Sequence, residues 1–302
     1  MTTILLNSLS FLITILAAFF LKKVGVLRQE DGQRVSKIIV FITLPATIIV
    51  GVNGFHVTLL TWLLLGMGIF CNVLLILAGF VVGRRKSVVE RGFYMFNLGG
   101  YNLGNFTIPF VTSFFPAAIP VIAMFDMGNS FMVAGTTQAI VETTNRKQKH
   151  GFDLRDPLRI LLKSPPFIVY IVMIVLAVFH LKLPAGALVP VHFLASGNSF
   201  LSLFMIGLFM QISLKKENLA VIGRVLLSRY LLAGILAVFV YFLLPFPHFV
   251  KLVLLLIFFC PISFLTTIQA TQFGVDEGAA GFASSLSMFI SLIVMSSIVI
   301  FL

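Results

Sequence analysis

The segment 97–115, NLGGYNLGNFTIPFVTSFF, and the segment 249–272, FVKLVLLLIFFCPISFLTTIQATQ, each carry a proline in the middle of a hydrophobic run. Pro109 and Pro261 both have uncharged polar residues around them. A proline in mid-helix removes a backbone hydrogen bond and clashes with the preceding turn, and lipid offers no water to repair the loss. Such breaks are tolerated where the freed backbone lines a cavity. One break in each half of a membrane chain indicates the binding site of a transporter.

The composition of the chain fixes its class. Of the 302 residues, 59% are hydrophobic and 10% are charged, and the mean hydropathy is +1.10. In a typical soluble domain, roughly a quarter of all residues are charged. The composition therefore predicts an all-α polytopic membrane protein.

Apolar segments long enough to cross a hydrocarbon core of about 30 Å as helices follow one another along the whole chain. Ten membrane spans are predicted, at 4–21, 36–53, 60–82, 93–115, 117–141, 165–181, 190–213, 224–244, 249–273 and 279–302. Cys71 and Cys260 both fall inside spans, where a thiol behaves as a small buried hydrophobe, so neither a disulfide nor a metal site is predicted.

Basic residues are distributed unevenly over the connections between these spans. The chain has 21 Lys and Arg against 10 Asp and Glu, a net charge of +11. Four alternate connections are predicted to carry nearly all of the basic residues: Lys22, Lys23, Arg28, Arg34 and Lys37; Arg84, Arg85, Lys86 and Arg91; Arg146, Lys147, Lys149, Arg155, Arg159 and Lys163; Lys215, Lys216, Arg224 and Arg229. Because cytoplasmic loops are enriched in Lys and Arg, both termini are expected to face outward. The positive charge is thus a topology signal, and no nucleic-acid partner is expected.

Ten helices with an outward start and an outward end divide into two sets of five. An odd number in each set turns the second set over in the membrane, which is the inverted-repeat plan of many secondary transporters. The basic connector 145–164 is the expected cytoplasmic boundary between the halves. Pro109 and Pro261 then lie in the fourth span of each half.

A broken helix exposes the amino terminus of a half-helix, whose free N–H groups and dipole attract anions. Two such ends are expected to bind a carboxylate without Lys or Arg, because the spans are expected to contain no deeply buried basic residue. The candidate substrate-binding residues are Asn102, Asn105, Thr107, Pro109, Pro261, Ser263, Thr266, Thr267 and Gln269. Their side chains either bind the substrate or only satisfy the kinked backbone.

Asp126 is the only acidic residue deep within a predicted span. It lies about nine residues, or roughly 14 Å, from the outer start of the fifth span, and so near the bilayer centre. Acidic residues at this depth are usually ion or proton sites. We expect Asp126, helped by Asn129 and Gln138, to couple transport to protons or sodium. The alternative is a neutral carboxyl group that is hydrogen-bonded within the bundle.

Three motifs resemble those of one family of membrane transporters. The pattern Asn102-Leu-Gly-Asn-Phe-Thr-Ile-Pro109 is similar to a motif of the broken fourth helix in the auxin efflux carrier family, and Ser164-Pro165-Pro166 is similar to the start of its sixth helix, with Ser in place of Asn. The segment 261–276, PISFLTTIQATQFGVD, followed by Ser284, Ser285 and Ser287, resembles its broken ninth helix and Ser-rich tenth helix. The family includes plant auxin exporters and bacterial carriers of small carboxylates.

The resemblance implies a division into two domains. Helices 1 and 2 (1–58) and helices 6 and 7 (165–218) would form a scaffold, and helices 3–5 (59–144) and 8–10 (219–302) a transport domain. The broken fourth and ninth helices would cross, and alternating access would come from movement of the transport domain against the scaffold. The resemblance also implies a homodimer through scaffold helices.

These features predict a secondary active transporter of the plasma membrane that moves a small organic anion. A mono- or dicarboxylate such as malate or malonate, or an auxin-like acid, would suit the site, with H⁺ or Na⁺ as coupling ion and no other cofactor. One alternative is an uncoupled anion channel or facilitator, although the charge rings and repeated filter backbone of pores are missing from the sequence. An intramembrane enzyme is less expected, because Asp126 has no second Asp and no His at membrane depth.

Overall fold

The computed structural model describes residues 2–145, 155–210 and 216–301, and every element named within them is a helix. The predicted all-α class is therefore confirmed. Among the described residues, six helical stretches of 24 to 29 residues are long and apolar enough to span a membrane: Gln29–Val52, Leu59–Gly83, Pro116–Thr144, Ala185–Phe209, Asn218–Leu243 and Glu277–Phe301. The described chain is thus a helical bundle with the lengths and apolarity of a membrane protein.

In the first half of the chain, three of the five predicted spans (36–53, 93–115 and 117–141) are not simple helices. Its elements, in order, are α1 (Thr2–Lys23), α2 (Gln29–Ile38), the π-helix η1 (Ile39–Thr43), α3 (Leu44–Val52), α4 (Leu59–Gly83), α5 (Val88–Leu98), the π-helix η2 (Leu103–Thr107), α6 (Ile108–Thr112), the 3₁₀-helix η3 (Pro116–Ala118), α7 (Ile119–Phe131), the π-helix η4 (Met132–Thr136) and α8 (Thr137–Thr144). Among the predicted spans, 4–21 falls on α1, and 93–115 is divided between α5 and α6.

The described elements of the second half are all α-helices. Its elements are α9 (Arg155–Leu161), α10 (Pro165–Val178), α11 (Ala185–Ser196), α12 (Asn198–Phe209), α13 (Lys216–Leu243), α14 (His248–Phe258), α15 (Phe264–Phe273) and α16 (Glu277–Phe301). The predicted span 165–181 falls on the short helix α10, and 249–273 is divided between α14 and α15. Within the connector 145–164, residues 146–154 lie outside the described residues. The number of ten spans, their inverted relation and the outward termini stay predictions.

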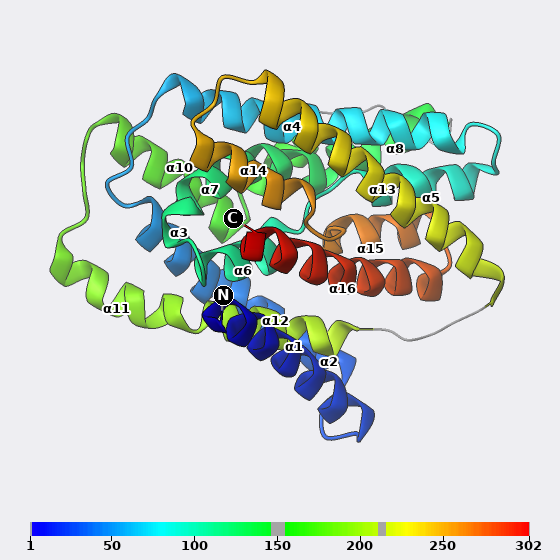
Figure 1. Cartoon of the computed structure of the whole chain (residues 1–302), viewed down its shortest axis with the longest axis horizontal. Coiled ribbons are helices and arrows are strands. Elements are labelled where there is room, and N and C mark those ends of the chain that lie inside the picture. Colours follow the sequence, from blue (N-terminus) through cyan, green and yellow to red (C-terminus); the bar gives the residue numbers. More distant parts are fainter. Residues whose placement is uncertain (1, 146–154, 211–215, 302) are drawn as a thin grey trace.

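The helices gather in two groups (Figure 1). α1, α2 and α12 pack together on one side of the molecule, α4, α5 and α13 lie on the opposite side, and α16 contacts both α1 and α13. Small residues allow the closest approaches: a Cβ on Gly207 of α12 would lie 2.2 Å from the Ile15 carbonyl oxygen of α1. Because lipid gives helices little hydrophobic drive to associate, such close backbone packing stabilises the bundle through van der Waals contact.

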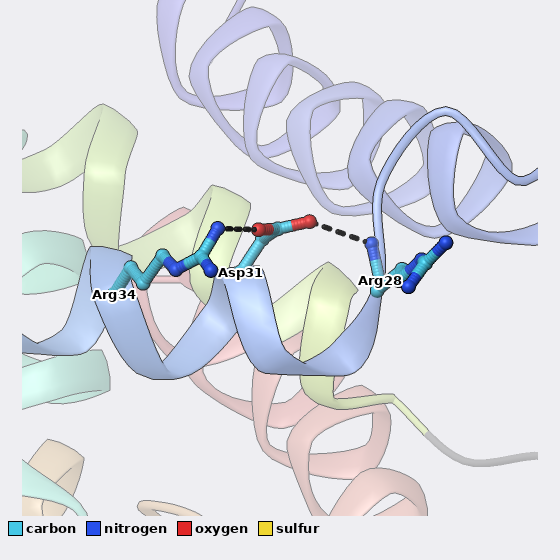
Figure 2. Close-up of polar contacts among 3 residues, drawn as sticks. All are labelled: Arg28, Asp31 and Arg34. Atoms are coloured by element: carbon cyan, nitrogen blue, oxygen red, sulfur yellow. Dashed lines mark hydrogen bonds and ion pairs between the residues drawn. The ribbon is translucent and has the colours of Figure 1, made fainter.

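The start of α2 is fixed by one carboxylate (Figure 2). Asp31 accepts a hydrogen bond from the Arg28 backbone N–H at 2.8 Å and one from the Arg34 guanidinium at 2.9 Å. A carboxylate in the first turn satisfies an otherwise unpaired N–H and complements the positive end of the helix dipole. The ion pair itself adds little stability, because the Arg34 side chain is 77% exposed. The contact holds the first turn of α2. Gln29 and Gln33 of this helix line a cavity described below.

Candidate functional site

Two helices are interrupted, and their interruptions lie against each other. Residues 99–102 separate α5 from η2, and residues 259–263 separate α14 from α15. Tyr101 and Ile262 form an isolated antiparallel bridge, and the Asn102 N–H donates to the Pro261 carbonyl at 3.1 Å. Segments from the two halves of the chain therefore cross at one point.

The prolines do not hold equivalent positions at this crossing. Pro261 lies within the second interruption, as predicted. The prediction that Pro109 breaks the fourth span is wrong, because Pro109 is the second residue of α6 and the helix ends earlier, at Leu98. Since η2 runs directly into α6, Pro109 lies in a continuous helix just after a wider π-turn, which leaves room for its ring.

Glycine determines where the first interruption lies. Gly100 has φ +78°, a conformation that side chains disfavour, and a Cβ there would lie 2.6 Å from the Thr266 Cγ2 atom. The first turn of α15 can therefore approach the interrupted segment closely only because residue 100 has no side chain.

Side chains of neighbouring helices satisfy the interrupted backbone. The Gly100 N–H donates to Asn72 Oδ1 at 2.7 Å, and Asn129 accepts from the Tyr101 N–H at 3.1 Å and donates to the Tyr101 carbonyl at 3.0 Å. The Ile262 N–H of the second interruption donates to Ser287 Oγ at 3.1 Å. Buried backbone groups in lipid require such partners.

The position of Arg229 contradicts two predictions. We expected it in a cytoplasmic connection, and we expected no deeply buried basic residue in the spans, but Arg229 lies in the middle of α13 and is 2% exposed. Its guanidinium donates to five carbonyl oxygens at the crossing: Nη1 to Asn97 at 2.7 Å and Leu98 at 2.9 Å, and Nη2 to Gly100, Cys260 and Pro261, each at 3.1 Å. The sequence does carry a signal for this burial, because Arg229 is four residues from the buried Val225 and from the buried Ala233.

Two helices begin at the crossing without a side-chain cap. Asn102 precedes η2 and Ser263 precedes α15, and neither residue caps its helix through a side-chain hydrogen bond. The first N–H groups of a helix have no partner within the helix, and together with the helix dipole they form an anion site. The crossing therefore presents two positive helix ends.

The candidate binding residues before Pro109 differ in their hydrogen bonding. The Thr107 hydroxyl donates to the Asn102 carbonyl at 3.3 Å and so satisfies backbone. Asn102 is 5% exposed, and its backbone is held by Pro261 and Thr107. Asn105 is half-buried, and its Oδ1 atom is buried without a hydrogen-bond partner in the part of the chain that the structure describes. The Oδ1 atom of Asn105 is thus an acceptor that remains available to a donor group.

The candidate residues after Pro261 mainly form hydrogen bonds within the protein. The hydroxyls of Thr266 and Thr267 donate to the Ser263 carbonyl, each at 3.0 Å. Gln269 donates through Nε2 to the Val133 carbonyl at 2.8 Å, next to the kink in η4 where Gly135 has φ +141°. For these residues the observed bonds are those of backbone repair.

Asp126 is buried and joined to the crossing through one amide. Asn129 Nδ2 donates to Asp126 Oδ1 at 3.0 Å while the same side chain binds Tyr101, and the Tyr170 hydroxyl donates to Asp126 Oδ2 at 2.9 Å. Gln138 is not brought to this cluster: it donates to Glu142 Oε1 at 2.8 Å on α8. Tyr170, on α10, is a partner that sequence reasoning missed, and its polar tip in an otherwise apolar helix was the available signal.

A cavity of about 190 Å³ reaches the first turn of α15 from between α2, α12 and α16. Its lining includes Phe264 and Thr267 of α15 and Ser284 and Ser285 of α16. The Ser284 Oγ atom is buried and has no hydrogen-bond partner among the described residues. The Phe209 and Phe264 rings stack with centroids 4.5 Å apart at its wall, so an aromatic pair flanks the approach to this helix end.

No protein-family model and no curated protein sequence matches this chain. The geometry of the crossing therefore carries the functional conclusion.

The crossing separates opposite partial charges. The carboxyl ends of α5 and α14, where helix carbonyls are unpaired, meet the Arg229 guanidinium, and the amino ends of η2 and α15 begin nearby. Within the described residues no cluster of three or more His, Cys, Asp or Glu is placed to hold a metal ion. The chemistry that these ends support is binding of an anion by N–H donors and hydroxyl groups.

Proposed function

We propose that this chain is a secondary transporter that moves a small organic anion across the plasma membrane by alternating access. The observation that carries the proposal is that η2 and α15 both begin, without side-chain caps, where the two interrupted helices cross. Discontinuous helices of this kind bind anionic substrate groups at their amino ends in secondary transporters. A mono- or dicarboxylate such as malate or malonate, or an auxin-like acid, matches two positive helix ends.

The cavity supplies an access route to one of these ends. It contacts the first turn of α15 and is lined by Ser284, whose hydroxyl group has no partner among the described residues and can donate to a carboxylate oxygen. Its lining also includes Gln29 and Gln33, which are next in sequence to the basic residues Arg28 and Arg34 that predict the cytoplasmic side. We propose that the cavity is the inward-facing vestibule for the substrate.

The hydrogen bond between Asp126 and Tyr170 supports a coupling role for Asp126. It joins α7, in the predicted transport domain, to α10, in the predicted scaffold, so movement of one domain against the other must break it. An ionised Asp126 accepts from Tyr170 more strongly than a neutral one, because charge-assisted hydrogen bonds are about twice as strong as neutral ones. Binding of H⁺ or Na⁺ at Asp126 would therefore weaken this contact and favour the movement.

A ligand screen tests the anion site. The purified protein is heated in the presence of malonate, malate, indole-3-acetate and uncharged amide analogues at several pH values. A ligand that binds the folded state raises the melting temperature, with about 2.7 kcal/mol of stabilisation at one hundred times its Kd. We expect at least one carboxylate, and no amide, to raise the melting temperature.

Two serine variants locate the binding. Ser284→Ala removes an unpartnered hydroxyl from the cavity and should reduce the shift caused by the active carboxylate. Ser297→Ala removes an exposed hydroxyl of the same helix, which bonds only to the Ile293 carbonyl one turn earlier, and should leave the shift unchanged. Equal shifts in both variants and in the wild type would place the ligand elsewhere, and no shift with any carboxylate would overturn the proposed substrate class.

A further inference from the structure

The Arg229 guanidinium is buried and has no acidic partner in the part of the chain that the structure describes. The ion pairs found in the described residues join Asp31 with Arg34 and Glu90 with Lys86, and neither involves Arg229. The groups around its guanidinium are five carbonyl oxygens and the Tyr101 ring, whose centroid lies 5.6 Å from Cζ. An unpaired charge is costly to bury, so these oxygen dipoles must supply the compensation.

The five oxygens share an electrostatic origin. Asn97 and Leu98 are the last residues of α5, Gly100 follows in the first interruption, and Cys260 and Pro261 follow α14. Carbonyls at the carboxyl end of a helix lack helical partners and carry the negative end of its dipole. In transporters with discontinuous helices, unwound carbonyls of this kind coordinate the coupling cation. Here a side chain of the protein holds that position.

We propose that the Arg229 guanidinium is a tethered cation that occupies a monovalent-cation site formed by the carbonyls of both interruptions. Arginine keeps its charge in proteins, and its planar fork of donors can serve several oxygens together. The intact protein then needs no bound Na⁺ to neutralise the two carboxyl helix ends. Replacing Arg229 with a small neutral residue opens the site to a free guanidinium ion or to Na⁺.

The position of Arg229 also separates the helix ends at the crossing into two kinds. Arg229 binds the carboxyl ends of α5 and α14 and leaves the amino ends of η2 and α15 free. Its partners lie on α5, α14 and the adjoining interruptions, which with α13 belong to one predicted domain, so none of these bonds must break when domains move. Arg229 would play this part whether or not the chain carries an anion.

Chemical rescue tests the proposal without any substrate. Arg229→Gly is purified, and its melting temperature is measured in guanidinium, sodium and choline chlorides at equal, low ionic strength. We expect a large loss in choline, recovery of at least half of that loss in guanidinium, and partial recovery in sodium. For the wild type and for Arg224→Gly, the melting temperature should be the same in the three salts, because Arg224 is exposed and its Nε donates to the Ala220 carbonyl of its own helix.

A second pair of variants covers the case in which Arg229→Gly does not fold. Arg229→Lys keeps a positive charge with fewer donors, whereas Arg229→Gln keeps an amide donor without charge. If the site requires a cation, Lys retains a higher melting temperature than Gln, measured by fluorescence-detected size exclusion after heating of detergent extracts. Equal losses in Lys and Gln, or a Gly variant that responds alike to the three salts, would overturn the proposal and leave Arg229 as a hydrogen-bonding strut.

Discussion

At the scale of single residues, several backbone groups freed by the interruptions meet particular partners. Asn72 and Asn129 bind the first interruption, Ser287 binds the second, and Arg229 binds both. Because these partners already repair the backbone, the unpartnered Oδ1 of Asn105 is not needed for that purpose. Because an amide oxygen accepts hydrogen bonds, Asn105 is the candidate of the first interruption that we favour for contact with a donor group of the substrate, such as the hydroxyl group of malate.

Gly100→Ala should destabilise the protein more than Gly25→Ala. Both glycines have positive φ, which costs a residue with a side chain about 1–2 kcal/mol. Only at Gly100 would the new Cβ also meet Thr266, at 2.6 Å, because nothing lies within 4 Å of a Cβ on Gly25. Thermal unfolding of both variants measures the difference, and equal losses would show that α15 does not approach residue 100 closely.

Asp126→Asn should abolish accumulation driven by an ion gradient. The amide cannot take up a proton or provide a negative charge for Na⁺, but its Oδ1 can accept from Asn129 and its Nδ2 can donate to the Tyr170 hydroxyl oxygen. Uptake of the active carboxylate into proteoliposomes, with and without pH and Na⁺ gradients, measures the effect. Glu142→Gln, at the end of α8, is the matched control and should keep the gradient response. A normal gradient response in Asp126→Asn would exclude the coupling role.

Some residues of the site could be predicted from the sequence and others could not. Asp126 was predictable because an acidic residue at membrane depth is rare. Asn72 and Tyr170 act through contacts between distant helices, which no local pattern encodes. Arg229 was counted with the cytoplasmic charges, although its spacing from Val225 and Ala233 places it on the buried face of α13.

At the scale of elements, the position of a break is set by glycine as much as by proline. Pro45 and Pro109 each lie second in an α-helix that follows a five-residue π-helix, and in both cases the chain continues as a helix. The wider π-turn accommodates the proline ring, which would clash with a carbonyl of the preceding α-turn. Mid-span prolines therefore predicted an irregular fourth span, but not that its interruption would lie at 99–102.

Gly68→Ala should destabilise the bundle, whereas Gly66→Ala should not. Both residues lie on α4, but a Cβ on Gly68 would lie 2.2 Å from the Phe125 carbonyl oxygen of α7, and nothing lies within 4 Å of one on Gly66. Alanine is favoured over glycine in a helix by about 0.5–1 kcal/mol, so Gly66→Ala should be neutral or stabilising. Melting temperatures of the two variants decide the matter, and a stable Gly68→Ala would contradict the close packing of α4 and α7.

At the scale of the whole molecule, composition was enough to predict an all-helical membrane bundle. Apolar side chains remain on the outside of the described chain, such as Phe242 at 74% exposure and Phe193 at 80%, as expected where lipid is the solvent. The pairing of helices was not predictable from composition, because it depends on small residues such as Gly207 that allow close approach.

The orientation in the membrane has a direct test. Arg85 lies in a basic connection predicted to be cytoplasmic, and Lys182 follows the predicted span 165–181, one membrane crossing away from the cytoplasmic connector 145–164, so it is predicted on the outer side. In intact cells, a membrane-impermeant maleimide should label Lys182→Cys and not Arg85→Cys, and permeabilised cells should allow both. The native thiols of Cys71 and Cys260 are buried and should give little background. Labelling of Arg85→Cys alone in intact cells would reverse the orientation.

Substrate counterflow tests the central proposal most directly. Proteoliposomes are loaded with the carboxylate that raised the melting temperature, and uptake of the same compound in labelled form is followed from outside. An alternating-access carrier returns faster when its site is occupied, so internal substrate should accelerate uptake, and Asn105→Ala should reduce this acceleration. Uptake that does not respond to internal substrate, together with large steady anion currents, would contradict a carrier and identify a channel.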